Sequence, residues 1–472
     1  MRYLNFSNTS FTCLPEQIGD LLNLQSLMLC GCRGLSTLPK SIVKLLNLRH
    51  LGITDTPKLK NMPSGLGGLF CLQTLSKVVI GGADKFSICD IKGLLYLEGQ
   101  LSIEGMHNVK NSLHAREANL QQKKGICDLR MEWSYGVLGD HQNEINDFEV
   151  LEGLRPFEKL TSLKIVNYIG TKFPSWIGDP SFVCLNQLAL HGCIKCTCLP
   201  TLGLLPSLQK LYVESMERLK NLGSELLGPS NSFHSPSLEI LEFKEMKSWE
   251  EWSTSGGEKA ISFPCLHEIS IIDCPKLDVV AIDSIPSLRV LHVQRCSLAV
   301  LKSMVGVSSS ISRLKICNIK GLTWLQREVL DHIREVEDLE ISKCVDLTYL
   351  WESEAATCKI PVNLQKLLVR RCANLVSFGE KEMNPSTSME SFKEVIIECC
   401  PRLESYNCPN SIEKLVIEEC RSITLLGFPA MDGLPSALKN LEIRRCGNLE
   451  ASWFLNNFLH HLNLSTFQGF RI

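Results

Sequence analysis

The chain has 472 residues, of which 44% are hydrophobic, and a formal net charge of −2 at pH 7. This near-neutral balance excludes a strong general attraction to nucleic acid. No run of eighteen apolar residues occurs, so we expect no membrane span. The first residues, MRYLNFSNTSF, lack the pattern of a secretory signal peptide, and we expect none.

A twelve-residue pattern recurs along the chain and predicts its fold. It reads LQKLLVRRCANL at residues 364–375, and similar stretches begin at Val336, Ile412 and Leu438. The apolar residues Leu367 and Val369 lie two apart, as on one face of a strand. The pattern is that of a leucine-rich repeat, L-x-x-L-x-L-x-x-N/C-x-L. Places within a repeat are numbered here from its first apolar residue.

Eighteen repeat starts follow from this pattern: Met1, Leu24, Leu48, Leu72, Glu98, Ile126, Leu160, Leu185, Leu208, Leu238, Leu266, Leu288, Ile311, Val336, Leu364, Phe392, Ile412 and Leu438. The starts at Leu72, Glu98 and Ile126 fit the pattern least well. The predicted fold class is α/β: a leucine-rich-repeat solenoid, or horseshoe, with a concave parallel β-sheet and turns or short helices on the convex side. We expect it to cover residues 1–450, with 451–472 as an atypical C-terminal tail or cap.

Both ends and two loops depart from the regular repeat. Residues 134–148 and 221–237 are rich in turn formers, and we expect them to be mobile loops. Met1 falls directly in the first strand with no polar cap before it, although a solenoid end needs covering. The sequence therefore predicts that the chain is the distal part of something longer.

Twenty-two cysteines raise the possibility of a disulfide scaffold, but their positions favour reduced thiols. Nine of them fill the ninth place of a repeat, where a small, half-polar side chain is expected to turn inward. This arrangement is typical of reduced, intracellular cysteines. The nine are Cys32, Cys193, Cys274, Cys296, Cys344, Cys372, Cys400, Cys420 and Cys446.

Two local clusters invite a more specific interpretation. The stretch HGCIKCTC at residues 191–198 resembles a metal knuckle. However, Cys193 and Cys196 occupy the ninth and twelfth places, so packing explains both, and we predict no metal. In SWEEW, Trp249 falls at the inward twelfth place and should pack, whereas Trp252 is left open. The scattered histidines form no catalytic arrangement, and the sequence predicts neither enzymatic activity nor a cofactor.

The outward places three, five and seven of the late repeats form the candidate partner-binding surface on the concave face. An apolar row is expected at the fifth place, and such patches often mark partner sites. Charged rows flank it, and they also fit a self-satisfied ladder of cross-strand ion pairs; both interpretations stay open. The residues are Lys366, Leu368, Arg370, Glu394, Ile396, Glu398, Lys414, Val416, Glu418 and Arg444, with Tyr212, His292 and Arg313 as possible extensions.

Irregular stretches carry a family resemblance. EANLQQKKGICDLRMEWS at 117–134, FPSWI at 173–177, LPTLGLLPSLQKL at 199–211 and MKSWEEW at 246–252 are not demanded by the repeat. With the early repeats, they resemble the leucine-rich-repeat region of plant intracellular disease-resistance proteins of the coiled-coil, nucleotide-binding class. The chain departs from such receptors because it contains no G-x-x-x-x-G-K-[ST] phosphate loop. The resemblance therefore assigns nucleotide binding to no residue of this chain.

The resemblance implies protein recognition in plant defence. The expected partners are a pathogen effector or a modified host protein, and a nucleotide-binding domain if the chain belongs to a longer receptor, which the repeats would help to hold inactive. We expect a cytoplasmic location, with the nucleus as the alternative, and no nucleic-acid partner. The alternatives are substrate-recognition repeats of a ubiquitin ligase, or an incomplete gene product without independent activity. An extracellular receptor fits less well, because N-x-[ST] sequons occur only at Asn5, Asn8 and Asn463.

Overall fold

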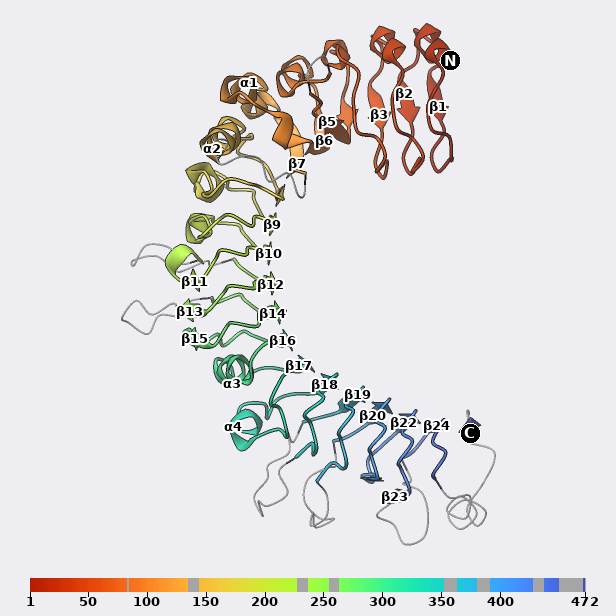
Figure 1. The fold of residues 1–472 in the computed structure, drawn as a ribbon, viewed down its shortest axis with the longest axis vertical. Coiled ribbons are helices and arrows are strands. Elements are labelled where there is room, and N and C mark those ends of the chain that lie inside the picture. The colour runs from red at the N-terminus through yellow and green to blue at the C-terminus, as the bar shows by residue number, and fades with distance from the viewer. Residues whose placement is uncertain are drawn as a thin grey trace. The chain divides into compact units, whose positions relative to one another are not determined.

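The computed structural model describes residues 1–82, 85–134, 144–226, 237–253, 263–351, 363–379, 391–427, 437–449 and 470–471. They form two compact units, Met1–Leu238 and Glu239–Ile472. Each unit is a stack of short parallel strands joined by turns and short helices that lie away from the strands (Figure 1). This is the repeating architecture of a leucine-rich-repeat solenoid, as predicted.

The first unit carries two parallel sheets. The order β1-β2-β3-β4 makes the first, and β5 to β10 follow one another in the second. The strands are β1 (Tyr3–Asn5), β2 (Ser26–Met28), β3 (His50–Gly52), β4 (Thr74–Leu75), β5 (Lys77–Val79), β6 (Glu98–Glu104), β7 (Gly125–Glu132), β8 (Ser162–Val166), β9 (Gln187–His191) and β10 (Lys210–Glu214), with a short outer strand β11 (Asn221–Leu222).

The second unit continues the same strand-by-strand order. Its strands are β12 (Ile240–Lys244), β14 (Glu268–Ile272), β16 (Val290–Gln294), β17 (Arg313–Cys317), β18 (Asp338–Ser342), β19 (Lys366–Arg370), β20 (Glu394–Glu398), β22 (Lys414–Glu418), β24 (Asn440–Arg444) and β25 (Phe470–Arg471). Four short outer strands pair separately: β13 (Glu251–Ser253) with β15 (Val279–Ala281), and β21 (Ser405–Asn407) with β23 (Leu425–Gly427).

Helical turns occupy the other side of many of the described repeats. The α-helices are α1 (Ser112–Glu117), α2 (Glu144–Gly153), α3 (Leu298–Gly306) and α4 (Arg327–Leu330). In other repeats, short 3₁₀ turns occupy this side. A side chain of one repeat can also cap the turn of the next repeat. The Glu16 carboxylate accepts hydrogen bonds from the backbone N–H groups of Lys40 (2.9 Å) and Ser41 (2.8 Å), which begin the following turn.

The strand register places equal positions of neighbouring repeats side by side. Leu367 pairs with Leu339 on one side and with Val395 on the other. The fourth- and sixth-place side chains therefore stack into a continuous core, in which Leu367 is 1% and Val369 0% exposed. A strand follows each predicted repeat start or, for Glu98 and Ile126, contains it.

Two early repeats contain an extra residue that the pattern did not reveal. Leu75 pairs with Leu51, but Val78 pairs with Ile103, so Ser76 is inserted between the inward residues and separates β4 from β5. The start at Glu98 is also wrong in detail. Glu98 is exposed, and the buried apolar residue is Leu97, which is 2% exposed.

A recurring corner ends most of the strands of the two units. The eighth-place residue adopts a left-handed conformation, for example Arg371 with φ 54°, and its N–H donates to the next strand, at 2.8 Å for Arg371 to the Glu398 carbonyl. The ninth-place thiol then turns inward; the Cys372 Sγ donates to the Arg370 carbonyl at 3.6 Å. Burial raises the pKa of the corresponding thiol of Cys344 to about 11, so it stays protonated near neutral pH.

Three sequence expectations fall largely outside the described residues. The loops predicted at 134–148 and 221–237 include the undescribed stretches 135–143 and 227–236. Of the C-terminal tail, only β25 is described, and it pairs in parallel with β24. The limits of the repeat domain and of the tail stay predictions.

We expect Leu367→Ala to destabilise the second unit by about 2–5 kcal/mol, because it opens a cavity between stacked repeats. The measurement is the urea unfolding midpoint followed by circular dichroism. Lys366→Ala is the matched control on the same strand, since the Lys366 side chain points outward and is 42% exposed. Equal losses in both variants would contradict the assigned register.

The buried Lys123 predicts an unusual pH dependence of the stability of the fold. Its side chain is 1% exposed, and Nζ donates to the Lys92 carbonyl at 3.2 Å. Burial lowers its pKa from 10.5 to about 8. Below pH 8 the folded state contains the buried, charged Lys123 ammonium group, which lowers the free energy of unfolding. This destabilisation disappears as the pH rises from about 8 to 10.5.

We therefore expect Lys123→Met to raise stability at pH 7 by about 1–3 kcal/mol. The advantage over the wild type should shrink as the pH rises towards 10.5, measured by chemical unfolding at each pH. Lys124→Met, which changes an exposed neighbour, is the control. A constant difference between the Lys123 variant and the wild type across this pH range would refute the argument.

Candidate functional site

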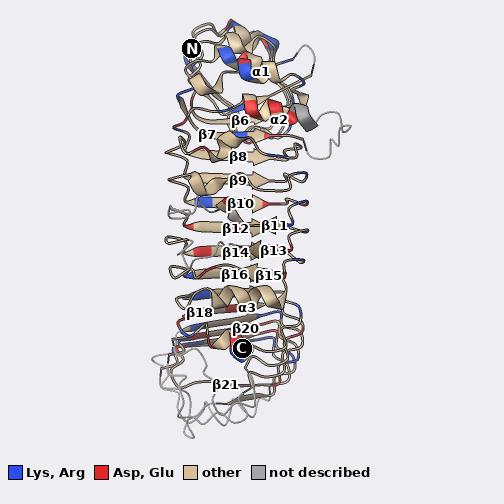
Figure 2. Cartoon of the chain, turned by 90° about the vertical axis from the view of Figure 1, so that its left-hand side faces the viewer, with Lys and Arg blue, Asp and Glu red and all other residues tan. Residues whose placement is uncertain are grey.

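The late-strand face is defined as the outward third-, fifth- and seventh-place side chains of β19, β20, β22 and β24. Hydrogen-bonded register aligns these places across neighbouring strands: Leu368 pairs with Ile396, and Ile396 with Val416. These strands contain both basic and acidic residues, and Figure 2 shows that residues of both signs are spread along the described repeats. The three rows that result differ in chemistry.

The third-place row is an alternating ion-pair ladder. The Glu394 carboxylate lies between two ammonium groups, at 2.9 Å from Lys366 and 2.8 Å from Lys414. Partial burial alone would raise the pKa of Glu394, but the hydrogen bonds from Lys414 and Lys366 outweigh it and lower the pKa. Arg313, predicted as an extension, pairs in the same place with Asp338 at 3.2 Å. Most of the charge in this row is therefore compensated within it, and one positive charge remains in excess.

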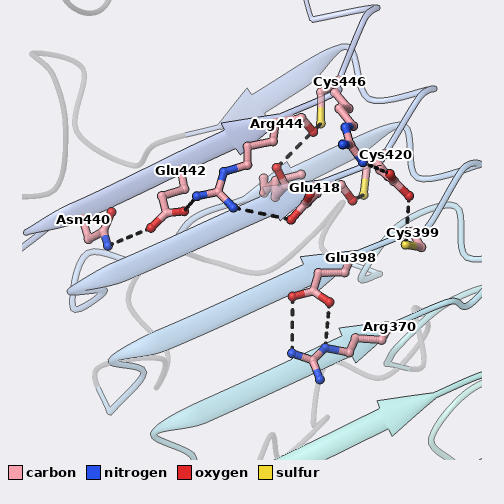
Figure 3. A network of polar contacts seen from close by, with 12 residues as sticks. Arg370, Glu398, Cys399, Glu418, Cys420, Asn440, Glu442, Arg444 and Cys446 are labelled. Carbon is pink, nitrogen blue, oxygen red and sulfur yellow. Dashed lines mark hydrogen bonds and ion pairs between the residues drawn. The ribbon is translucent and has the colours of Figure 1, made fainter. Parts of the chain in front are cut away.

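The seventh-place row is less complementary (Figure 3). The Arg370 guanidinium binds Glu398 through Nε at 2.8 Å and Nη2 at 3.3 Å. Arg444 lies 2.6 Å from Glu442 and 3.8 Å from Glu418. The register places Glu398 directly beside Glu418. Like charges on neighbouring strands repel, so this point of the row favours an added cation.

The fifth-place row exposes less apolar surface than the sequence suggests. Leu368 and Val416 are only 9% and 8% exposed. Ile396 is half-buried and is the more accessible member. The acidic residues Glu340 and Glu442 end the row on either side. The apolar contribution of this face is therefore concentrated at Ile396.

The other two predicted extensions are placed differently. Tyr212 lies on β10 in the first unit and His292 on β16 in the second. Burial lowers the pKa of His292, and its buried Nε2 makes no hydrogen bond to any described residue. Neither residue adjoins the late-strand face, since β17 and β18 intervene between β16 and β19.

Two of the three cysteines of the 191–198 stretch act as core residues, and the third, Cys198, is exposed. Cys193 and Cys196 are fully buried, and the Cys196 thiol donates to the Gly170 carbonyl at 3.2 Å. Burial raises the pKa of Cys193 to about 12, which opposes the thiolate that a metal requires. His191 turns outward instead, with Nδ1 at 2.7 Å from Glu214. Among the described residues, no group of three potential ligands is placed to hold a metal ion.

Both tryptophans of SWEEW are buried. Trp249 packs as predicted, and Trp252, which the sequence left open, is also 0% exposed. Their rings surround Phe243, at centroid distances of 4.7 Å for Trp249 and 5.5 Å for Trp252. The pair therefore stabilises the repeat rather than forming an exposed binding patch.

The sequence reasoning missed the eighth-place residues. They have positive φ in successive repeats, and most of those in the second unit are neither glycine nor asparagine. Their side chains contact one another along the strand ends: Arg295 lies 3.1 Å from Asp273, and Arg445 pairs with Glu419. Spacing from the ninth-place cysteine identifies these positions, but only the backbone angles reveal their strain.

None of the described helices is both long and apolar enough to cross a bilayer.

The stacked strands with inward leucines make the chain a leucine-rich-repeat protein. Residues 88–216 match the family described as R13L1/DRL21 LRRs. That range contains three of the irregular stretches on which the family resemblance depends, at 117–134, 173–177 and 199–211.

Curated relatives extend the likeness. The chain is 32% identical over 308 residues to a disease resistance RPP13-like protein 1 of Arabidopsis thaliana, covering 63% of this chain and 29% of that protein. It is 31% identical over 384 residues to disease resistance protein RGA2 of Solanum bulbocastanum, covering 75% and 36%. A third relative, RGA1 of the same species, is 31% identical over 365 residues, covering 72% and 36%.

The predicted relationship to the leucine-rich repeats of plant disease-resistance proteins is confirmed. The chain spans about a third of the length of these curated relatives, with shares of 29% and 36%.

Glu394→Gln tests how much the third-place ladder stabilises the fold. We expect a loss below about 1 kcal/mol, because both lysine partners are partly exposed. The lowered pKa means that this contribution is present above the ordinary value of 4.5 and is lost as the pH falls through the folded value. Urea unfolding at pH 7 and pH 3 measures it, with exposed Glu337→Gln as the control.

Proposed function

We propose that the chain is the protein-recognition module of a plant disease-resistance protein. In this role it would sense a pathogen effector or a modified host protein. The observation that carries the proposal is the relationship to disease-resistance repeats over most of the chain. The rigid stack of strands supports it, because a fixed scaffold can present many outward side chains to one partner.

The late-strand face is our candidate contact surface. Ile396 supplies an accessible apolar group, and Glu398 and Glu418 next to it carry like charges on neighbouring strands. A partner that places an apolar side chain on Ile396 and a lysine or arginine between the two carboxylates would relieve this repulsion. The third-place ladder then fixes the surrounding side chains rather than contributing much affinity.

We further propose a second role within a longer receptor. There the repeats would contact the nucleotide-binding part and help to hold it inactive, as the family resemblance implies. This role concerns a partner domain outside the present chain, so it is tested by adding the chain in trans to a repeat-free relative. Lower spontaneous cell death in leaves on addition supports the role, and an unchanged level opposes it.

The recognition proposal is tested with a panel of pathogen effectors and host proteins in a two-hybrid screen. Binding of any positive partner is then quantified by biolayer interferometry. We expect Ile396→Arg to weaken the interaction at least tenfold, because it removes the apolar contact and places a cation beside the carboxylates that would bind the partner's cation. Thermal stability is measured in parallel to exclude unfolding.

Ile272→Arg is the matched control. Ile272 is also a half-buried outward isoleucine, but it lies on β14, outside the late-strand face. Binding should be retained in this variant. A screen without any specific partner would overturn the recognition proposal, and equal losses in both variants would overturn the assignment to the late-strand face.

A further inference from the structure

A row of exposed cations follows the ends of the late strands, beside the late-strand face. One lies in each of six successive repeats, between the eighth and eleventh places. The same places contain only two acidic residues, Asp346 and Glu419. The corner row is defined as Lys320, Lys343, Arg371, Arg402, Arg421 and Arg445.

The two acidic residues are already engaged. Asp346 accepts the backbone N–H of Gly321 at 2.8 Å. Glu419 pairs with Arg445 and also accepts the Cys399 thiol at 3.2 Å. The corner row thus retains a larger excess of positive charge than the third-place ladder, which lies at the other end of the strands.

Backbone strain gives an independent reason to assign a role to these side chains. Lys343, Arg371 and Arg445 sit at the eighth place with φ of 55°, 54° and 54°. A left-handed conformation is unfavourable for an ordinary residue, and glycine or asparagine tolerates it better. Cys399 and Glu419 also adopt it at the eighth place, so the strain marks the corner and the excess of cations marks its charge. The corner's hydrogen bond uses only the backbone N–H, so the fold itself does not require a cation there. Strained positions occupied against preference point to function.

We propose that the corner row binds an extended acidic segment of a protein partner. Six neighbouring strands span about 24 Å, since parallel strands lie about 4.8 Å apart. An extended chain advances about 3.3 Å per residue, so roughly seven residues match the row. This surface is distinct from the late-strand face and does not depend on the defence role.

A protein fits the corner row better than a nucleic acid does. Single-stranded nucleic acids bind surfaces that interleave cations with aromatic side chains for base stacking. The described eighth- to eleventh-place residues of these six repeats include no aromatic side chain. Exposed Val345, at 49%, instead offers an apolar contact beside Lys343. The expected ligand is therefore an acidic peptide with an apolar residue among its carboxylates.

The test uses a fluorescein-labelled ten-residue polyglutamate peptide and fluorescence anisotropy at 50 mM and 200 mM NaCl. Saturable binding that weakens at higher salt is expected. The variant Lys343→Asn/Arg371→Asn/Arg402→Ser/Arg421→Ser should bind at least tenfold more weakly. Its melting temperature should be unchanged or higher, because asparagine suits the left-handed corners.

A charge-matched control distinguishes the effect of the corner row from the effect of the protein's net charge. Lys58→Ser/Lys60→Ser/Lys124→Ser/Lys159→Ser removes four exposed cations from the first unit. It should bind the peptide within twofold of the wild type. An equal loss in this control, no saturable binding by the wild type, or tighter binding of a ten-nucleotide oligothymidylate would each overturn the proposal. None of these outcomes bears on the effector-binding test.

Discussion

The stacking of equal places in neighbouring repeats is the constraint on which every other feature depends. Because Leu367 pairs with Leu339 and Val395, the side chains next to it in sequence must face outward in matching rows. A slip of one residue would exchange the inward and outward sets. The same register that builds the core therefore also creates the ion-pair ladder, the apolar row and the corner row.

The features that repeat with the core were predictable from the sequence. Leu367 and Val369 are inward, Cys372 fills the bend, and Trp249 packs, because each occupies a place whose environment the repeat defines. Local insertions were not predictable. The insertion of Ser76 and the shift of a repeat start from Glu98 to Leu97 each add one residue and leave the number of apolar residues unchanged. Only the strand pairing and the burial of the side chains therefore reveal them.

The candidate surface was predictable only in part, because its properties arise between strands. The outward direction of Leu368 and Val416 follows from alternation, yet the alternation does not predict that they are only 9% and 8% exposed. The opposition of Glu398 and Glu418 requires knowing which repeat is adjacent. Trp252 lies just beyond the repeat pattern, so its packing on Phe243 had no sequence signal.

Two adjoining surfaces of the late repeats thus obey different electrostatic rules. On the strands, a charge meets the next strand's charge at short range, so opposite signs lower the energy and a ladder such as Lys366–Glu394–Lys414 forms. At the corners, side chains leave the sheet and are solvated, so the fold constrains their sign less. An excess of one sign can be held there at little cost in stability, and it is available to steer and bind a charged partner. The corners can therefore vary their charge without disturbing the core that positions them.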